Sequence, residues 1–328
     1  MIDRRTFASL AAGGLLGISL AAAAQQTDKV RRIGFLAKGP RPLDGTVPAL
    51  LRKALQALGY TEGKDIIFEG RWAEVRSERL PALAAELVAA KVDLIVTLGG
   101  EAAAAAKQAS SAIPIIVFNA GDVVETGLVS SLARPGGNVT GVNDQSAVLS
   151  AKRLELLKEL VPAATRVAVL WNANDRAMTL RYREIEKAAQ ALRVRIEPLG
   201  VSEPDDFDVA LTAMSRTRPD ALMMVTDALT VLNRQRVIDY TATHRIPAVY
   251  EYGSLVQGGG LMSYGGDMGE NYKLAADYVS KVLKGAKPGD LPVEQPNRYF
   301  LVINMKAAKA LGLTIPQSLL LRADEVIQ

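Results

Sequence analysis

Polar residues that could hold a charged solute follow several predicted strands of this chain. Gly99 and Gly100 come directly before a predicted helix, where bare backbone amides and the helix dipole favour a carboxylate. Asp122 and Asp227 also follow predicted strands, and each could neutralise an ammonium group. These residues have structural alternatives as well, because glycines form tight turns and aspartates cap helices. The pattern therefore favours binding of a small solute and leaves the individual contacts open.

Amide and aromatic side chains stand at further strand ends. Asn172 and Asn174 can donate and accept hydrogen bonds, which suits a zwitterion, but asparagine is also a frequent turn residue. Trp171 ends a predicted strand and is a better candidate for a cavity wall than Trp72, which lies in a charged segment. Flat rings with a polar edge, which suit an aromatic solute or the packing of one lobe on the other, come from Tyr250, Tyr252 and Tyr264.

These residues meet only if their strands are parallel neighbours, because ligands of open α/β sheets bind at the carboxyl ends of the strands. That rule selects loops at residues 38–43, 99–102, 119–122, 172–176, 226–229 and 250–254. The candidates that it adds are Lys38, Glu101, Asn119 and Thr226. Glu101 has a second explanation, since an acidic residue in the first turn of a helix complements the helix dipole.

The elements that must position these loops alternate between strand and helix. Apolar runs predict strands at 32–37, 66–71, 92–98 and 113–119, separated by helices at 47–58, 80–90 and 101–109. This alternation is typical of a parallel sheet with helices on both faces. The expected fold class is therefore α/β.

A second series with matching landmarks follows residue 141. The motif at 91–96 has its counterpart at 218–223, and the Ile-Pro pair at 113–114 returns at 246–247. Further predicted elements are helices at 149–160, 272–283 and 306–311 and strands at 166–171, 262–265 and 299–304. We expect two similar lobes. Lobe 1 takes residues 30–140 and about 266–290, lobe 2 takes 141–265, and 291–328 either join one lobe or bridge both.

The stretch from Ser131 to Gly141 contains a proline, three glycines and an asparagine, so it fits neither a helix nor a central strand. We expect it to carry the chain from one lobe to the other, with a second crossing near Gly265. The predicted hinge residues are Arg134, Pro135, Gly136, Gly137, Asn138 and Gly265.

Composition excludes several classes of function. The formal net charge of +4 is scattered along the chain, so no nucleic-acid partner is expected. The absence of cysteine excludes disulfides, thiol nucleophiles and thiolate metal sites, and the single His244 makes a histidine metal site or a catalytic triad difficult to build. We expect no metal, no cofactor and no enzymatic activity. A periplasmic hydrolase with paired carboxylates is the alternative.

Residues 1–24 are predicted to be a signal peptide. A charged start precedes an apolar run from Phe7 to Leu20, and small residues at Ala22 and Ala24 suit cleavage near Ala24. Arg4 and Arg5 resemble a twin-arginine signal, with an ordinary secretory signal as the alternative. Either route exports the mature protein.

Several longer motifs carry a resemblance. They lie at 127–141, 152–159, 259–265, 283–296, 309–316 and 322–327. With these motifs the chain resembles a family of ABC-transporter substrate-binding proteins that includes tryptophan- and tyrosine-binding lipoproteins. The resemblance implies a type I periplasmic-binding-protein fold, whose lobes close on a solute and present it to a membrane permease.

Departures from the family pattern affect localisation and ligand. The chain has no cysteine to carry a lipid, so we expect a free periplasmic protein, acting as a monomer. Asp122-Val123-Val124 lacks the proline common in the family, and Asn172-Ala173-Asn174 stands where Asn-Pro is common. The ligand therefore stays open between an amino acid and another aromatic or carboxylate compound. A ligand sensor that signals to a membrane receptor is the alternative to transport.

Overall fold

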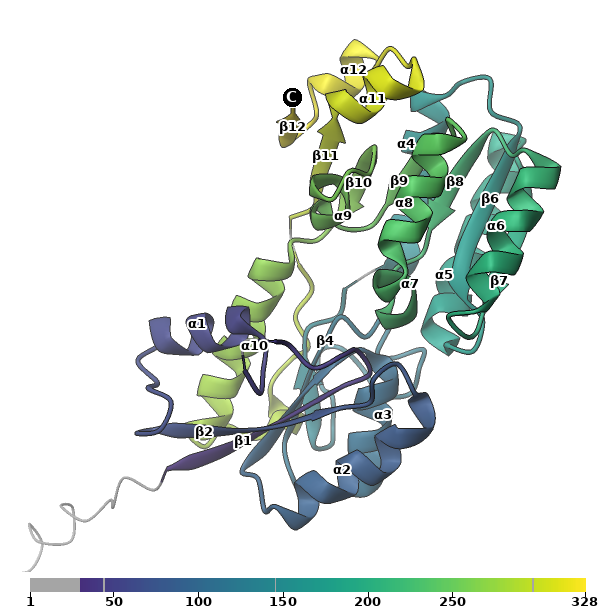
Figure 1. Ribbon diagram of the computed structural model, residues 1–328. Coiled ribbons are helices and arrows are strands. Elements are labelled where there is room, and N and C mark those ends of the chain that lie inside the picture. The colour runs from purple at the N-terminus through teal and green to yellow at the C-terminus, as the bar shows by residue number, and fades with distance from the viewer. Residues whose placement is uncertain (1–29, 44, 145, 297) are drawn as a thin grey trace, which may run out of the picture.

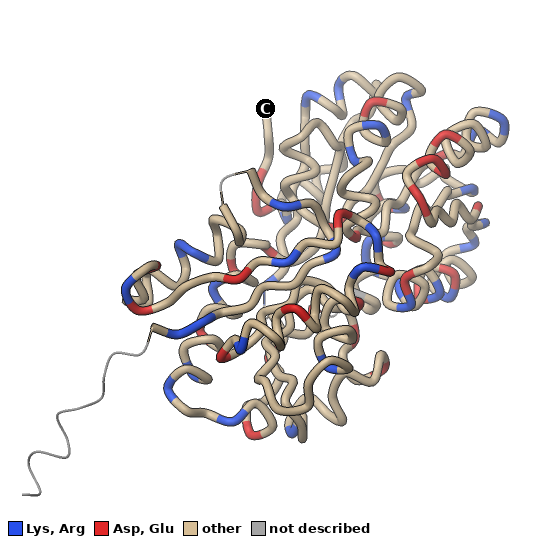
Figure 2. The backbone as a smooth tube through the Cα atoms, turned by 60° about the horizontal axis from the view of Figure 1, so that its bottom comes forward, with Lys and Arg blue, Asp and Glu red and all other residues tan. Residues whose placement is uncertain are grey.

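Two lobes, each built around one sheet, make up the computed structural model of this chain, which describes residues 30–43, 45–144, 146–296 and 298–328 (Figure 1). The strand orders are β2-β1-β3-β4-β5 in lobe 1 and β12-β11-β10-β9-β8-β6-β7 in lobe 2. The predicted signal peptide lies outside these ranges. No helix within them is long and apolar enough to cross a bilayer. Figure 2 shows basic and acidic residues interspersed over both lobes.

Lobe 1 is a five-stranded parallel sheet with helices on both faces. Its strands are β1 (Arg31–Ala37), β2 (Ile66–Trp72), β3 (Leu94–Leu98), β4 (Ile115–Phe118) and β5 (Val139–Gly141). One face packs against α2 (Leu80–Ala89) and α3 (Gly100–Ala109). The other face packs against α1 (Ala49–Ala57) and α10 (Met268–Leu283). The short helix η1 (Ser77–Arg79) directly precedes α2. Because both faces are covered, Ile33, Phe35 and Leu36 in β1 are fully buried.

Lobe 2 is a seven-stranded sheet that is parallel except at one edge. Its strands are β6 (Arg166–Asn172), β7 (Arg195–Val201), β8 (Ala221–Met224), β9 (Ala248–Tyr250), β10 (Met262–Gly265), β11 (Phe300–Asn304) and β12 (Glu325–Ile327). The strand β11 runs antiparallel to β10, which differs from the expected all-parallel sheet. The reason is that the chain leaves the lobe at the end of β10 and returns to it at the start of β11. The end of one strand therefore lies beside the start of the other.

Helices cover both faces of the lobe 2 sheet. One face packs against α4 (Ser146–Leu160), α5 (Arg176–Leu192), α11 (Met305–Leu311) and α12 (Gln317–Leu320). The other packs against α6 (Asp206–Thr217), α7 (Ala228–Leu232), α8 (Arg234–Thr243) and α9 (Gly253–Gln257). The two-lobe α/β fold predicted from the sequence is confirmed.

The described chain passes between the lobes at three places. The first crossing follows Gly141, because β5 pairs in lobe 1 and α4 packs in lobe 2. The second follows Gly265 and leads into α10, which begins earlier than predicted because Asp267 accepts a hydrogen bond of 2.9 Å from the Glu270 amide. The third follows Glu294, whose amide donates to the Gly141 carbonyl at 3.0 Å in lobe 1 before β11 joins lobe 2. Residues 291–328 therefore bridge both lobes.

The hinge predicted at Arg134, Pro135, Gly136, Gly137 and Asn138 is corrected by the structure. Asn138 Nδ2 donates hydrogen bonds of 2.8 Å to the Ser110 and Ile113 carbonyls, just before β4. The Gly136 amide donates to the Gly289 carbonyl in the short helix η2 (Pro288–Asp290) of the same lobe. These residues therefore form a loop at the amino ends of β4 and β5, whereas the crossing leaves the carboxyl end of β5. Of the predicted hinge residues, Gly265 lies at a crossing.

Candidate functional site

A cavity of about 440 Å³ lies where the two lobes meet. Lobe 1 lines it with the loops after β1, β3 and β4 and with Trp72, the last residue of β2. Lobe 2 lines it with the loops after β6, β8 and β9, and α10 contributes Met268 and Tyr272. The carboxyl ends of parallel strands therefore form both walls, which is the usual place for a ligand in open α/β sheets.

The lobe 1 wall carries a buried lysine beside the start of a helix. Lys38 Nζ lies 3.0 Å from Glu101 Oε2, and Ser77 Oγ donates a hydrogen bond of 2.7 Å to the same oxygen. Gly99 precedes α3 with a φ of 93°, and no side chain caps the first amides of that helix. Because Glu101 already pairs with Lys38, the first amides of α3 are the groups of this wall that favour an anion.

The lobe 2 wall is acidic. Asp175 caps α5 by accepting a hydrogen bond of 2.8 Å from the Ala177 amide. Asp227 caps α7, and Asn172 Nδ2 donates to its second carboxylate oxygen at 2.7 Å. Both carboxylates are therefore held in place by the local backbone and side chains of lobe 2.

Asp175 lies in an environment that disfavours its charge. Burial raises its pKa to about 6, and the carboxylates of Glu101 and Asp227 add to the shift. Lys38 and the Met178 amide act in the opposite direction. Because Glu101 belongs to lobe 1 and Asp175 to lobe 2, like charges face each other across the boundary between the lobes.

Aromatic and sulfur-containing side chains supply the apolar part of the wall. They are Trp72, Met178, Tyr252, Met268 and Tyr272. The indole Nε1 of Trp72 donates to the Thr46 carbonyl at 3.0 Å, which fixes the orientation of the ring. The Tyr272 ring packs edge-on against Phe118 with 4.9 Å between ring centroids. The cavity can therefore accommodate a solute with a flat, apolar body.

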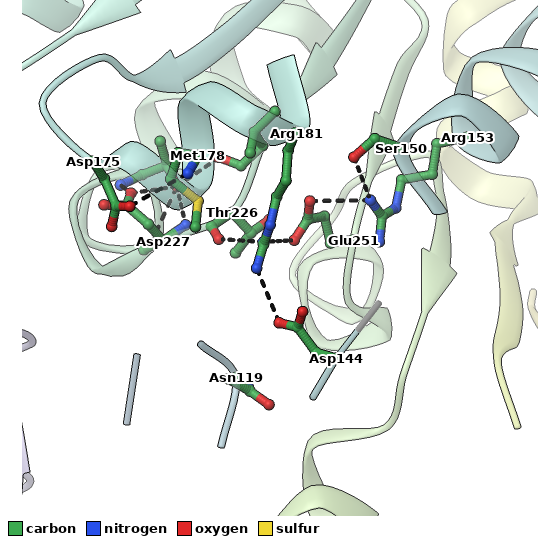
Figure 3. Close-up of polar contacts among 12 residues, drawn as sticks. Asn119, Asp144, Ser150, Arg153, Asp175, Met178, Arg181, Thr226, Asp227 and Glu251 are labelled. Carbon is green, nitrogen blue, oxygen red and sulfur yellow. Dashed lines mark hydrogen bonds and ion pairs between the residues drawn. The ribbon is translucent and has the colours of Figure 1, made fainter. Parts of the chain in front are cut away.

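A chain of buried ion pairs lies behind the lobe 2 wall (Figure 3). Arg181 of α5 contacts Asp144 Oδ2 at 2.9 Å and Glu251 Oε2 at 2.8 Å, and Arg153 of α4 contacts Glu251 Oε1 at 3.1 Å. Arg153 Nε also donates to the Tyr264 carbonyl at 2.6 Å. Asp144 belongs to the first crossing, and Tyr264 precedes the second. The network therefore anchors both crossings to the interior of lobe 2.

The lobes also contact each other beside the cavity. Val75 of lobe 1 packs against the lobe 2 core with a φ of 68°, which is a strained conformation for a β-branched residue. Arg176 of α5 donates to the Glu125 carbonyl of lobe 1 at 3.2 Å. At Gly121 of lobe 1, a Cβ would lie 3.1 Å from the Ala177 Cβ of lobe 2. These contacts bring the lobes together around the cavity.

A family model described as ABC transporter substrate binding protein matches residues 44–327. The chain belongs to this family. One relative is the tyrosine-binding protein of Clostridioides difficile (strain R20291). It is 29% identical over 328 residues, covering 95% of this chain and 94% of the relative.

Two solved structures resemble this substrate-binding protein over 91% of its chain and 100% of theirs. An ABC domain from Streptococcus pneumonia in complex with L-Trp is 27% identical, with a TM-score of 0.83. A substrate binding protein with adhesive properties from Clostridium difficile, in a ligand-free, open structure, is 25% identical, with a TM-score of 0.65. The predicted type I periplasmic-binding-protein fold and the family resemblance are confirmed.

Many of the residues singled out in the sequence line the cavity. They are Lys38, Gly99, Gly100, Glu101, Asn119, Thr226, Asp227 and Tyr252. Asn119 also joins the end of β4 to α10, since its Oδ1 accepts a hydrogen bond of 2.7 Å from Asn271 Nδ2. The strand-end rule therefore brings together residues that are far apart in the chain.

Three polar candidates have other positions. Asp122 does not line the cavity, because its carboxylate accepts hydrogen bonds from the Val124 and Glu125 amides in a turn. Asn172 lies behind Asp227 and is 1% exposed. Asn174 is exposed, and its amide donates to Asn172 Oδ1. The structural alternatives for Asp122 and Asn174 therefore describe them better.

Three aromatic candidates lie outside the cavity lining. Tyr250 is fully buried in the lobe 2 core, because it is a strand residue covered by helices. Trp171 stacks on Tyr182 of α5 with 3.9 Å between ring centroids. The Tyr264 ring lies 6.2 Å from the Tyr299 ring, measured between centroids, and packs against the same core cluster as Trp171. Packing within lobe 2 therefore explains all three.

Trp72 and Asp175 line the cavity although sequence reasoning did not select them. Trp72 pairs with Ala37 in the register of β2 and β1, so the end of β2 and the loop after β1 coincide. Applying the strand-end rule to β2 could have found it. Asp175 lies within a selected loop, and its position before a helix is an N-cap signal. The sequence carries no such signal for Tyr272 and Met268, because their position at the cavity depends on where the second crossing places α10.

Proposed function

We propose that this substrate-binding protein captures an amino acid with an aromatic or apolar side chain between its lobes and delivers it to an ABC permease in the inner membrane. The observation that carries the proposal is the cavity of about 440 Å³ lined from both lobes, a volume typical of small-molecule sites. The first amides of α3 on the lobe 1 wall oppose the acidic wall near Asp175, which suits a zwitterion. The tyrosine-binding relative and the L-Trp complex support this ligand class.

Transport begins with closure of the lobes on the solute. A ligand that contacts both lobes only when they are closed favours the closed state by its differential affinity. The contact of Val75 with the lobe 2 core and the TM-score of 0.83 with the L-Trp complex, against 0.65 with the ligand-free, open structure, support a closed arrangement here. Opening would occur by rotation about the crossings.

The site of action proposed for this protein is the periplasm. After export and removal of the signal peptide near Ala24, it acts as a monomer, with no cofactor and no nucleic acid as a partner. It releases its ligand chemically unchanged. This assignment is supported by membership in a family of transport proteins.

Isothermal titration of the mature protein with L-tyrosine and L-tryptophan tests the proposal. We expect binding of at least one of them, with glucose as a control that does not bind. Ligand at about one hundred times its Kd should stabilise the protein by roughly 2.7 kcal/mol, which a thermal-shift assay detects. Recovered ligand of unchanged mass is expected by mass spectrometry. No heat and no thermal shift with any amino acid would overturn the proposal.

Gly121→Asn is expected to weaken amino-acid binding about tenfold, a loss of roughly 1.4 kcal/mol. A side chain there meets Ala177 of the other lobe, with a Cβ distance of 3.1 Å, and therefore obstructs the closed state. Gly127→Asn is the matched control, because Gly127 also has a positive φ of 78° but nothing within 4 Å of its Cβ position. Asparagine tolerates such a φ in both places. Equal affinities of the two variants, measured by titration, would contradict closure at Gly121.

A further inference from the structure

The apolar lining of the cavity gathers on one side of lobe 1. Four lining residues belong to the core cluster that packs against α1 and α10: Trp72, Leu98, Met268 and Tyr272. Asn119 brings a polar side chain to the same side, because it directly follows β4 and contacts α10. A polar group beside apolar walls decides how a ligand is oriented and which ligands fit. Asn119 is therefore a candidate for recognising the side chain of the solute.

The backbone and one neighbour hold the Asn119 amide in a fixed position. Its φ of 53° lies in the left-handed region, which asparagine adopts more readily than most residues. Asn119 Oδ1 accepts a hydrogen bond of 2.7 Å from Nδ2 of Asn271, which is 2% exposed. The amide is therefore positioned before a ligand arrives.

The nitrogen of the same amide has a weak partner. Asn119 Nδ2 donates to the thioether sulfur of Met268, and a thioether is a poor acceptor. The opposite orientation of the amide would place Oδ1 against this sulfur with no hydrogen between them. An oxygen atom of a ligand is a stronger acceptor than the sulfur, so exchanging one for the other favours binding.

We propose that Asn119 is a specificity-determining residue that donates a hydrogen bond from Nδ2 to a hydroxyl on the aromatic ring of the solute. This inference rests on the proposed function and adds the ring chemistry that the cavity prefers. The ring lies among Trp72, Met268 and Tyr272, whose side chains suit a flat apolar body. A site that hydrogen-bonds a hydroxyl disfavours the analogue without it, so a phenol ring is preferred to a phenyl ring.

Titration with L-tyrosine and L-phenylalanine measures this preference, since the two amino acids differ by one hydroxyl. We expect L-tyrosine to bind about tenfold more tightly, near the upper end of the net gain from one neutral hydrogen bond. Equal or reversed affinities would overturn the role of Asn119 and leave the proposed function intact. If no amino acid binds, the proposed function itself fails and this inference falls with it.

The variant Asn119→Gly separates the amide from the backbone conformation. Glycine keeps the positive φ and removes the donor, so the ratio of L-tyrosine to L-phenylalanine affinity should fall to about one. Arg245→Gly is the matched control, because Arg245 also has a positive φ, of 54°, but does not line the cavity. That control should keep the wild-type ratio. A wild-type ratio in Asn119→Gly would overturn the assignment, even if both affinities fall.

The variant Asn119→Asp supplies a readout that a merely structural role would not move. Aspartate also tolerates a positive φ, and its carboxylate accepts a hydrogen bond that the phenol hydroxyl donates. The added negative charge acts on both ligands alike, so the affinity ratio is the quantity to compare. We expect a ratio of at least about tenfold, because hydrogen bonds to charged groups are stronger than neutral ones. A ratio near one would show that the hydroxyl does not contact this side chain and would overturn the inference.

Discussion

Replacing Arg181 with leucine is expected to lower the free energy of unfolding by about 3–5 kcal/mol. Arg181 is 2% exposed and contacts Glu251 at 2.8 Å and Asp144 at 2.9 Å. Burial acts to lower its pKa, but these carboxylates raise the pKa above the ordinary arginine value, so the side chain stays charged. Leucine removes the cation that pairs with Asp144 and one of the two cations that pair with Glu251, and a buried carboxylate that loses a cation is costly. The loss should therefore be among the largest from any single substitution.

Urea denaturation followed by circular dichroism measures this loss. The midpoint should decrease while the slope of free energy against urea stays constant, because the folded and unfolded states keep similar exposed areas. Lys187→Met on the same helix is the matched control, since the Lys187 side chain is 72% exposed in its ion pair with Glu184. That change should stay within about 0.5 kcal/mol. Losses of equal size at both positions would refute the role assigned to the buried network.

The network could not have been predicted from the sequence. Arg181 and Glu251 are separated by 70 residues, and the sequence around each resembles an ordinary helix face or strand end. Their pairing depends on α5 lying against the end of β9, which only the assembled sheet defines. Sequence reasoning identifies charged residues well, but it does not reveal which of them are buried together.

The strands were easier to predict, because burial on both faces requires continuous apolar runs. The expected strand at 166–171 differs by one residue from β6, and that at 32–37 by one residue from β1. The short β5 was missed, since its three residues follow a loop rich in glycine and proline. Such a composition signals irregular backbone and does not say at which end of a strand the loop lies. The hinge was therefore assigned to the wrong end of β5.

The residues of the cavity also divide into those that the local sequence predicts and those that only the assembled fold determines. Loops at strand ends follow from the parallel α/β pattern, so Gly99, Glu101 and Asp227 were found. Which aromatic side chain turns inward depends on neighbouring elements. Trp171 stacks on Tyr182 of α5 in the lobe 2 core, whereas the Trp72 indole at the cavity donates a hydrogen bond to the Thr46 carbonyl. The sequence alone does not give the strand register, so it could not predict which of the two tryptophans lines the cavity.

Gly265→Ala is expected to lower the free energy of unfolding by about 3 kcal/mol, the upper end of the usual cost of overpacking. A Cβ at Gly265 would lie 2.1 Å from the Glu251 carbonyl oxygen and 3.4 Å from Arg153 Nη2. Backbone cannot yield as a flexible side chain can, so β10 would have to move away from β9. Gly137→Ala is the control, because nothing lies within 4 Å of its Cβ position. Denaturation of both variants measures the difference, which should vanish if the close approach at Gly265 is unimportant.

Gly141 meets the same constraint at the first crossing, where a Cβ would lie 2.0 Å from the Val117 carbonyl oxygen. Each lobe thus ends a strand in a glycine packed against the backbone of the neighbouring strand, and the chain leaves for the other lobe directly afterwards. Because neither glycine tolerates a side chain, we expect Gly141→Ala to destabilise the protein at least as much as Gly265→Ala. Its φ of +139° adds strain that the Gly265 variant does not carry. A smaller loss at Gly141 would show that β5 shifts more easily than β10.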